Sequence, residues 1–272
     1  HTASDSDQYI VSGWIGRYLD TYGKHPYNAI EIDDQLSLAM KGNTKNGIAT
    51  KDPKILYRSS QDPFFKKVLR AYNEQQKDNL EYLYSTMIDA ESSAKYIFET
   101  SRTFHTHQEY PQNPLANQLR TAAKFINAGL DTRVYYTSLN GFDTHAGQLN
   151  KQNRLLGIYA ESMEAFINDL KQNNTFKDTL IMTFSEFGRR VAQNAANGTD
   201  HGTANNVFLI GENLKQKGIY NEAPDLSNLD GNGDLKHSID FRSIYATILN
   251  KWLLTNDQVI LNQQKFPLLD LI

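Results

Sequence analysis

The sequence predicts an α/β fold with a mostly parallel sheet. In the second half of the chain, helical patterns and short apolar runs follow one another in the order helix, strand, helix, strand, loop, strand, which is typical of α/β proteins. Two of these runs, at 178–184 and 206–210, are almost continuously apolar, as expected for strands that are buried on both faces. The chain has 272 residues, enough to bury a sizeable core. We expect a single domain over residues 1–272, with a helical and loop-rich portion at 1–112 and an α/β core at 113–272.

The first portion is expected to be mainly helical. A short helix is predicted over 12–20 and a strand over 27–32. Asp62 followed by Pro63 is typical of a helix N-cap and a first-turn proline. No Gly or Pro interrupts residues 64–103, so one or two long helices are expected there. Their apolar residues recur at helical spacing: Phe65, Val68, Leu69, Leu80, Leu83, Met87 and Ile88.

The second portion carries the alternating pattern. Gly129 follows an apolar helical face and occupies the position of a helix C-cap. A loop-rich stretch separates the last strand from a closing helix, whose apolar residues form one stripe. The expected elements are helices over 115–128, 149–170 and 240–253 and strands over 134–139, 178–184 and 206–210.

Composition excludes several classes of function. The net charge is −3, from 28 Lys and Arg against 31 Asp and Glu, and no long basic run occurs, so a nucleic-acid partner is not expected. No apolar window is as long as a membrane span. The chain contains no cysteine, which excludes thiolate metal ligands and a Cys nucleophile and fits an exported protein.

A first group of candidate site residues follows the expected strand at 134–139. Asp143 and His145 are two positions apart, so in an extended backbone their side chains point to the same side. In open α/β sheets, ligands bind at the carboxyl ends of the strands. A carboxylate and an imidazole placed there can hold a metal ion or share a proton.

Two further groups lie beside the other expected strands. Glu186 and Arg189 come just after the second strand, and Asp200 and His201 stand between glycines just before the third. Because Asp200 and His201 are adjacent, they point apart in an extended backbone. Either the glycines bend the chain so that both face one ion, or each serves a different ion.

Together these groups predict a metal site without sulfur. Imidazole and carboxylate are the ligands of hydrolytic zinc, manganese or iron sites. Two such ions a few ångströms apart would clamp the attacking and leaving oxygens of a phosphoryl or sulfuryl transfer, and Arg189 or Arg190 would hold an oxygen of the anion. The predicted metal ligands are Asp143, His145, Glu186, Asp200 and His201.

Each group also has a purely structural interpretation. Asp143 is typical of a turn cap, Glu186 of a helix cap or an ion pair, and Asp200 with His201 of an ordinary turn. The stretch at 230–234 resembles a calcium loop but lacks its glycine and closing glutamate, so a turn is expected. His105 and His107 are interpreted as exposed loop residues.

Six segments carry a resemblance to a known family: 13–19, 129–134, 141–145, 185–189, 198–202 and 240–246. In this order they resemble the bacterial family called domain of unknown function 1501. That family belongs to the alkaline phosphatase-like, or sulfatase-like, superfamily. The resemblance implies a three-layer α/β/α sandwich with two metal ions at the carboxyl edge of a mostly parallel sheet.

The resemblance also assigns roles and shows departures. Asp143 and His145 match the Asp and His of one metal site, and His201 matches a later His of the superfamily. The segment at 185–189 falls where the superfamily has an Asp-His pair for the second metal. Glu186 keeps a carboxylate there, but Phe187 stands where the imidazole should be, so the second site is expected to be altered or absent.

A second departure concerns the N-terminus. Members of the family begin with a strand and an Asp-containing loop upstream of the region matched by residues 1–20. That part supplies a metal ligand, and in active relatives the nucleophile also lies in the N-terminal region. The resemblance therefore implies a chain that is incomplete at its N-terminus, from a protein that is periplasmic or secreted in its full-length form.

These observations lead to two functional hypotheses. The first is a metal-dependent hydrolase of small phosphate or sulfate esters, with Glu186 as ligand or base and Arg189 as an anion clamp. Its cofactor would be a divalent ion (Zn, Mn, Fe or Ca), or none in a chain without the N-terminal part. The second is a non-catalytic periplasmic or cell-surface binding module with the same fold, which Phe187 and the missing nucleophile favour. A purely structural protein would leave the five residues scattered. No oligomeric state is predicted.

Overall fold

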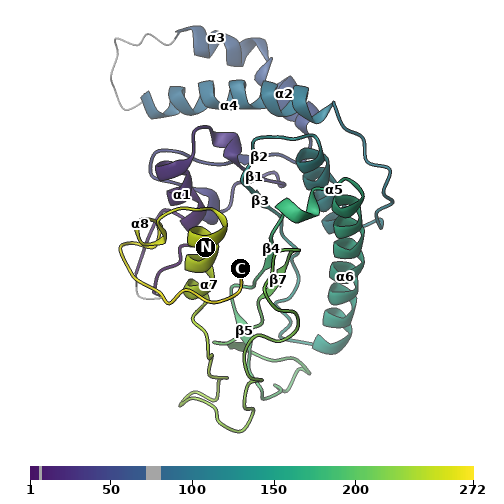
Figure 1. Ribbon diagram of the computed structural model, residues 1–272, viewed down its shortest axis with the longest axis vertical. Coiled ribbons are helices and arrows are strands. Elements are labelled where there is room, and N and C mark those ends of the chain that lie inside the picture. The colour runs from purple at the N-terminus through teal and green to yellow at the C-terminus, as the bar shows by residue number, and fades with distance from the viewer. Residues whose placement is uncertain (6–7, 72–80) are drawn as a thin grey trace. The chain divides into compact units, whose positions relative to one another are not determined.

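The computed structural model describes residues 1–5, 8–71 and 81–272 (Figure 1). It is a mixed α/β protein with a small parallel sheet and eight α-helices among the described residues. The chain divides into two compact units, which are described separately. The first unit comprises residues 1–138 and 260–263, and the second comprises 139–259 and 264–272. The boundary at residues 138–139 therefore follows the third strand of the chain.

A three-stranded parallel sheet lies at the centre of the first unit. Its strands are β1 (Ala29–Glu31), β2 (Ile48–Ala49) and β3 (Val134–Tyr136), in the order β2-β1-β3. Ile30 pairs with Ile48 on one side and Tyr135 on the other, and its side chain is fully buried. The apolar central strand thus behaves as expected for a parallel sheet covered on both faces.

Helix α1 (Trp14–Tyr22) packs closely on the loop that follows β1. A Cβ added at Gly13 or Gly16 would lie 2.1 Å from the backbone of Leu38 or Lys41, so both positions need glycine for the close approach. Arg17 is buried, and its guanidinium donates to the carbonyl groups of Ser12, Thr2 and Ile260. The 13–19 segment is therefore structural. Two short 3₁₀ helices, η1 (Pro26–Asn28) and η2 (Leu38–Met40), flank β1.

Three of the remaining helices of the first unit begin with an Asp or Asn N-cap followed by proline. Asp62 accepts hydrogen bonds from the amides of Phe64 and Phe65 at 2.9 and 3.2 Å, which confirms the predicted N-cap. Asp52, before Pro53, caps a helix that was not predicted. Leu80 and the side chain of Leu83 lie outside the described residues. The helices are α2 (Pro53–Ser60), α3 (Pro63–Ala71), α4 (Glu81–Ser101) and α5 (Pro114–Asn127).

In the second unit, the predicted helix at 149–170 is confirmed as α6 (Gln148–Gln172). The predicted helix at 240–253 is divided into α7 (Phe241–Thr247), capped by Asp240, and a π-helical turn, η4 (Ile248–Trp252). The other elements are η3 (Phe176–Asp178), β4 (Ile181–Thr183), β5 (Gly188–Arg189), β6 (His201–Gly202), β7 (Phe208–Ile210) and α8 (Asp257–Ile260), which ends at the boundary between the units.

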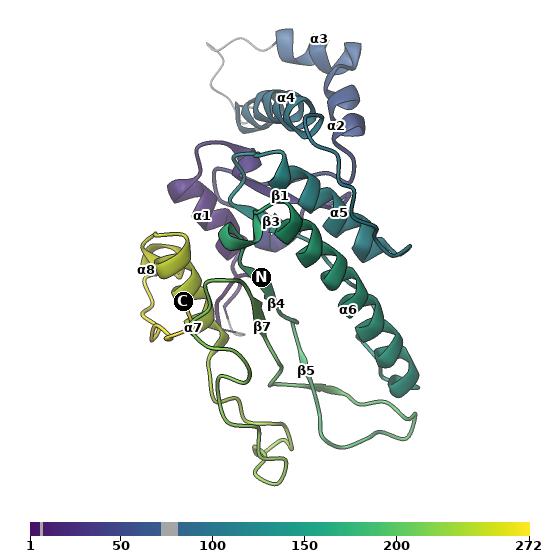
Figure 2. The ribbon, with the colours of Figure 1, turned by 45° about the vertical axis from the view of Figure 1, so that its right-hand side comes forward.

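The predicted parallel arrangement is wrong for β4 and β7. These strands lie side by side (Figure 2) and pair antiparallel, with Met182 opposite Leu209. Parallel neighbours need a long crossover, usually a helix, whereas the chain between β4 and β7 contains only the β5–β6 pair and loops. The expectation of burial on both faces also fails. Strand β4 is only half-buried, and Phe208 of β7 is 51% exposed.

No helix among the described residues is both long enough and apolar enough to cross a membrane.

Candidate metal centre

The loop that joins β3 to α6 carries the first two candidate ligands, and backbone contacts fix its path. The amides of Gly147 and Gln148 donate to the carbonyl groups of Ala196 and Asn197 at 3.1 and 2.9 Å. Asn194 donates from its side chain to the carbonyl of His145 at 2.9 Å. The loop is therefore attached along its second half to residues 194–197.

Glycines allow the third candidate ligand to approach. Strands β5 and β6 pair antiparallel, with Gly188 opposite Gly202 and Arg189 opposite His201. A Cβ at Gly188 would lie 1.8 Å from the carbonyl oxygen of Ala204, and one at Gly198 would lie 2.2 Å from the backbone of His145. Gly198 and Gly202, which flank Asp200 and His201, thus allow close contact between backbone segments. They do not bend the chain so that both side chains face one ion.

Asp143, His145 and His201 converge on one point. Asp143 Oδ1 lies 2.8 Å from His145 Nδ1 and 2.8 Å from His201 Nε2. One ligand atom from each of the three residues lies within 4.8 Å of the others. The side chain of Asp143 is 58% exposed, and those of His145 and His201 are each 48% exposed. A tetrahedral zinc ion needs ligand atoms about 3.4 Å apart, so small side-chain movements would let all three bind one ion.

The charge of Asp143 suits a ligand role. A hydrogen bond from His201 holds the pKa of this carboxyl below its ordinary value, against a weaker opposing effect of desolvation. The charges of His145, His201 and Arg189 act in the same direction as the hydrogen bond. Asp143 is therefore ionised at neutral pH, which is the form that binds cations.

Arg189 holds the two halves of the site together. Its guanidinium donates to the carbonyl groups of Thr199, at 2.6 Å, and Phe142, and lies 3.4 Å from Asp143 Oδ1. The side chain is only 15% exposed. Because two of its nitrogens already donate to backbone carbonyls, the geometry favours a positioning role. Its role as an anion clamp stays a prediction.

The Phe187 ring packs against the imidazole of His201. The two rings stack, with centroids 4.0 Å apart and planes 9° apart, and the guanidinium carbon of Arg189 lies 5.1 Å from the Phe187 centroid. Sequence reasoning treated Phe187 only as a lost ligand. A ring that stacks on a histidine distant in sequence produces no recognisable pattern in a single amino-acid sequence.

Two predicted ligands lie outside the three-residue cluster. Glu186 and Asp200 are both exposed, and neither contributes an atom to the group formed by the described residues. Asp200 lies directly before β6, whose first residue is His201. Their roles as ligands, and that of Glu186 as base, stay predictions.

The neighbouring Arg190 joins a separate turn. Its Nε lies 3.2 Å from Oδ1 of Asp234, which is buried. Asp230 accepts hydrogen bonds from the amides of Asn232 and Asp234 at 2.8 and 2.9 Å. The stretch at 230–234 is therefore the predicted turn, and Arg190 attaches it to the strand that carries Arg189.

Comparison with known proteins identifies the family. The family model described as "Protein of unknown function (DUF1501)" matches residues 8–268. The chain belongs to this family. No curated protein and no solved structure matches the chain. The family expected from the sequence is thus confirmed, and the function of this DUF1501 chain must be argued from its site.

Replacing Phe187 with leucine tests its support of His201. An aromatic stack contributes about 0.5–1.5 kcal/mol beyond area burial, so we expect zinc to bind about two- to twelvefold more weakly. The measurement is a competition titration against a chromogenic chelator. Phe187→Tyr keeps the ring and should bind zinc as the unmodified chain does. Equal affinities for the leucine and unmodified chains would show that the stack does not position His201.

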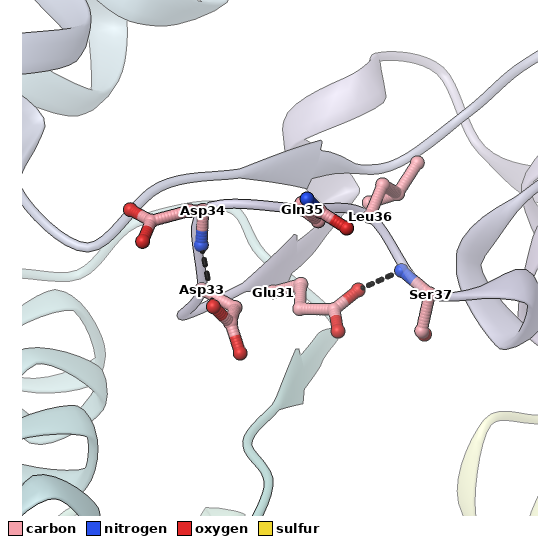
Figure 3. Close-up of a pocket in the computed structure, with 6 residues that line it drawn as sticks. All are labelled: Glu31, Asp33, Asp34, Gln35, Leu36 and Ser37. Carbon is pink, nitrogen blue, oxygen red and sulfur yellow. Dashed lines mark hydrogen bonds between the residues drawn. The ribbon is translucent and has the colours of Figure 1, made fainter.

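A second polar feature of the DUF1501 chain lies in the first unit, at the carboxyl end of β1 (Figure 3). A cavity of about 360 Å³ is lined by Glu31 and residues 33–37. Glu31 is 4% exposed, and its Oε2 accepts a hydrogen bond from the amide of Ser37 at 2.7 Å. Burial raises the pKa of Glu31, although the bonds from Ser37 oppose the change.

The raised pKa gives Glu31 a defined effect on stability. The folded chain holds this proton more tightly than the unfolded chain, so the contribution of Glu31 to stability falls as pH rises above its unfolded pKa of about 4.3. Glu31→Gln removes the charge, so it should raise the unfolding free energy more at pH 7 than at pH 4. Urea unfolding at both pH values measures the difference. The exposed Glu109→Gln should show no such change, and a pH-independent effect of Glu31→Gln would refute the assignment.

Proposed function

We propose that this protein is a metal-dependent hydrolase of small phosphate or sulfate esters. The observation that carries the proposal is the convergence of Asp143, His145 and His201 on one exposed point. Two imidazoles and one carboxylate favour zinc, manganese or iron over calcium. Three protein ligands leave a coordination position open, as in catalytic rather than structural zinc sites.

The residues of the chain would divide the work as follows. A bound ion would act as a Lewis acid on an ester oxygen. Asp143 and the two histidines would hold the ion, Arg189 and Phe187 would fix the positions of Asp143 and His201, and the exposed Glu186 would serve as ligand or base. The exposure of the cluster supports access for a substrate from solvent.

The finer fold and location are part of the same proposal. We infer an alkaline phosphatase-like three-layer sandwich, supported by the parallel β2-β1-β3 sheet and by a metal-site loop that begins shortly after β3. Export to the periplasm or the cell exterior is supported by the absence of cysteine.

The alternative is a non-catalytic binding module that holds one ion. Two observations favour it over a two-metal enzyme: Phe187 stacks on His201 where a second imidazole was expected, and the Arg189 guanidinium donates to backbone carbonyls. On this alternative the site would bind metal without turnover.

An assay of p-nitrophenyl phosphate and p-nitrophenyl sulfate hydrolysis by the full chain distinguishes the hydrolase from the binding module. For the hydrolase we expect zinc- or manganese-dependent turnover of at least one ester, lost on chelation and in His201→Ala. His105→Ala, an exposed histidine outside the cluster, is the matched control and should keep full activity. Stoichiometric metal binding without turnover of either ester would reject the hydrolase and support the binding module.

A further inference from the structure

A second cavity lies in the first unit. All of its lining residues precede those of the candidate metal centre in the sequence. Its volume is about 650 Å³, within the range of small-molecule sites. Its walls come from the start of α2, the end of α4 and the C-terminal half of α5, which Figure 1 shows near one another. The lining residues are Lys51, Asp52, Pro53, Lys54, Phe98, Ser101, Arg102, Thr121 and Lys124.

The lining of this cationic cavity is strongly positive. Four side chains are cationic and one is a carboxylate. Lys51 already pairs with Asp33, at 3.3 Å, and with Asp34, and Asp52 accepts the amide of Lys54 as the cap of α2. That leaves Lys54, Arg102 and Lys124, none of which forms an ion pair within the part of the chain that the structure describes.

Helix stability does not account for this arrangement. Lys124 and Arg102 lie at helix C-termini, where cations are favourable, and Arg102 also lies 5.3 Å from the Phe98 ring centroid. Lys54 instead lies in the first turn of α2, where the helix dipole disfavours a cation. Three separate elements thus direct like charges to one cavity, an arrangement that costs free energy unless an anion offsets it.

We propose that the cationic cavity binds a small anion with two or more negative charges on phosphate or sulfate oxygens. Arg102 supplies a planar pair of donors suited to such oxygens, and Lys54 and Lys124 supply point charges from the two other walls. The Phe98 ring, stacked on Tyr57 at 4.6 Å, forms an apolar wall for the remainder of the ligand. None of the residues that line the cavity belongs to the metal centre.

Calorimetric titration of the full chain with inorganic pyrophosphate, at low ionic strength and after removal of metal with chelator, tests this assignment. We expect one site per chain, with an affinity that falls as salt rises. The double variant Arg102→Ala/Lys124→Ala should bind at least about tenfold more weakly. Lys24→Ala, an exposed lysine of the same unit outside the cavity, should bind as the unmodified chain does. Asp143→Asn should also leave pyrophosphate binding unchanged, which keeps this result separate from the metal centre.

Two results would overturn the assignment. One is the absence of pyrophosphate binding by the unmodified chain up to millimolar concentration. The other is binding that the double variant retains or that Lys24→Ala reduces equally. Lys124→Arg is a control for a general loss of structure, because it keeps the positive charge. This variant should have an unchanged melting temperature and should bind pyrophosphate within about twofold of the unmodified chain.

Discussion

Replacing Asp143 with asparagine is expected to lower the affinity of the chain for zinc at least about a hundredfold. Asp143 Oδ1 is the atom that both imidazoles approach, at 2.8 Å each. The change removes the only carboxylate of the three-residue cluster, and a neutral amide oxygen is a much weaker ligand for a divalent ion. Competition against a chromogenic chelator at pH 7 measures the loss.

The control for this variant is Asp225→Asn. Asp225 is an exposed carboxylate of the same unit that accepts hydrogen bonds from Ser227, so its replacement should leave zinc affinity unchanged. Because the pKa of Asp143 is lowered, its carboxyl stays ionised between about pH 5 and pH 8. Any change of zinc affinity over that interval must therefore come from other groups. An Asp143→Asn chain that binds zinc as tightly as the unmodified chain would exclude Asp143 as a ligand.

Gly188→Ala is expected to destabilise the chain by about 3 kcal/mol or more. The added Cβ would meet the carbonyl oxygen of Ala204 at 1.8 Å and its carbon at 2.6 Å, so β5 and the segment after β6 must separate. That movement pulls Arg189 away from His201, its partner in the ladder. We therefore expect weaker zinc binding together with a lower unfolding free energy, measured by urea unfolding.

Gly157→Ala is the matched control because Gly157 lies inside α6 with no atom within 4 Å of an added Cβ. Alanine should keep the stability or raise it by up to about 1 kcal/mol, since it favours helix more than glycine does. Equal effects of the two substitutions would mean that close packing at Gly188 is not required.

Much of the local structure could be predicted because its signals are local. Asp62 before Pro63 marks the start of α3. Gly129 has a φ of 75°, as expected for a glycine that ends a helix. The pairing direction of β4 and β7 could not be predicted in this way, because an apolar run of a given length fits either direction. The absence of a helix between these strands was the relevant observation.

The site shows the same division between local and distant information. Asp143, His145 and His201 were chosen for their chemistry and their places beside strands, and the structure brings these three together. Arg189 was chosen as an anion clamp, but it donates to the carbonyl of Phe142, which is 47 positions away. Contacts of a side chain with a distant backbone atom leave no periodic pattern, and the same holds for the stack of Phe187 on His201.

The central claim is that Asp143, His145 and His201 hold one divalent ion. Anomalous diffraction from a crystal of the full chain equilibrated with zinc tests it most directly. We predict one anomalous peak about 2.0–2.2 Å from Asp143 Oδ1, His145 Nδ1 and His201 Nε2. A crystal with saturating zinc that shows no peak there, while the three side chains keep their mutual hydrogen bonds, would contradict it.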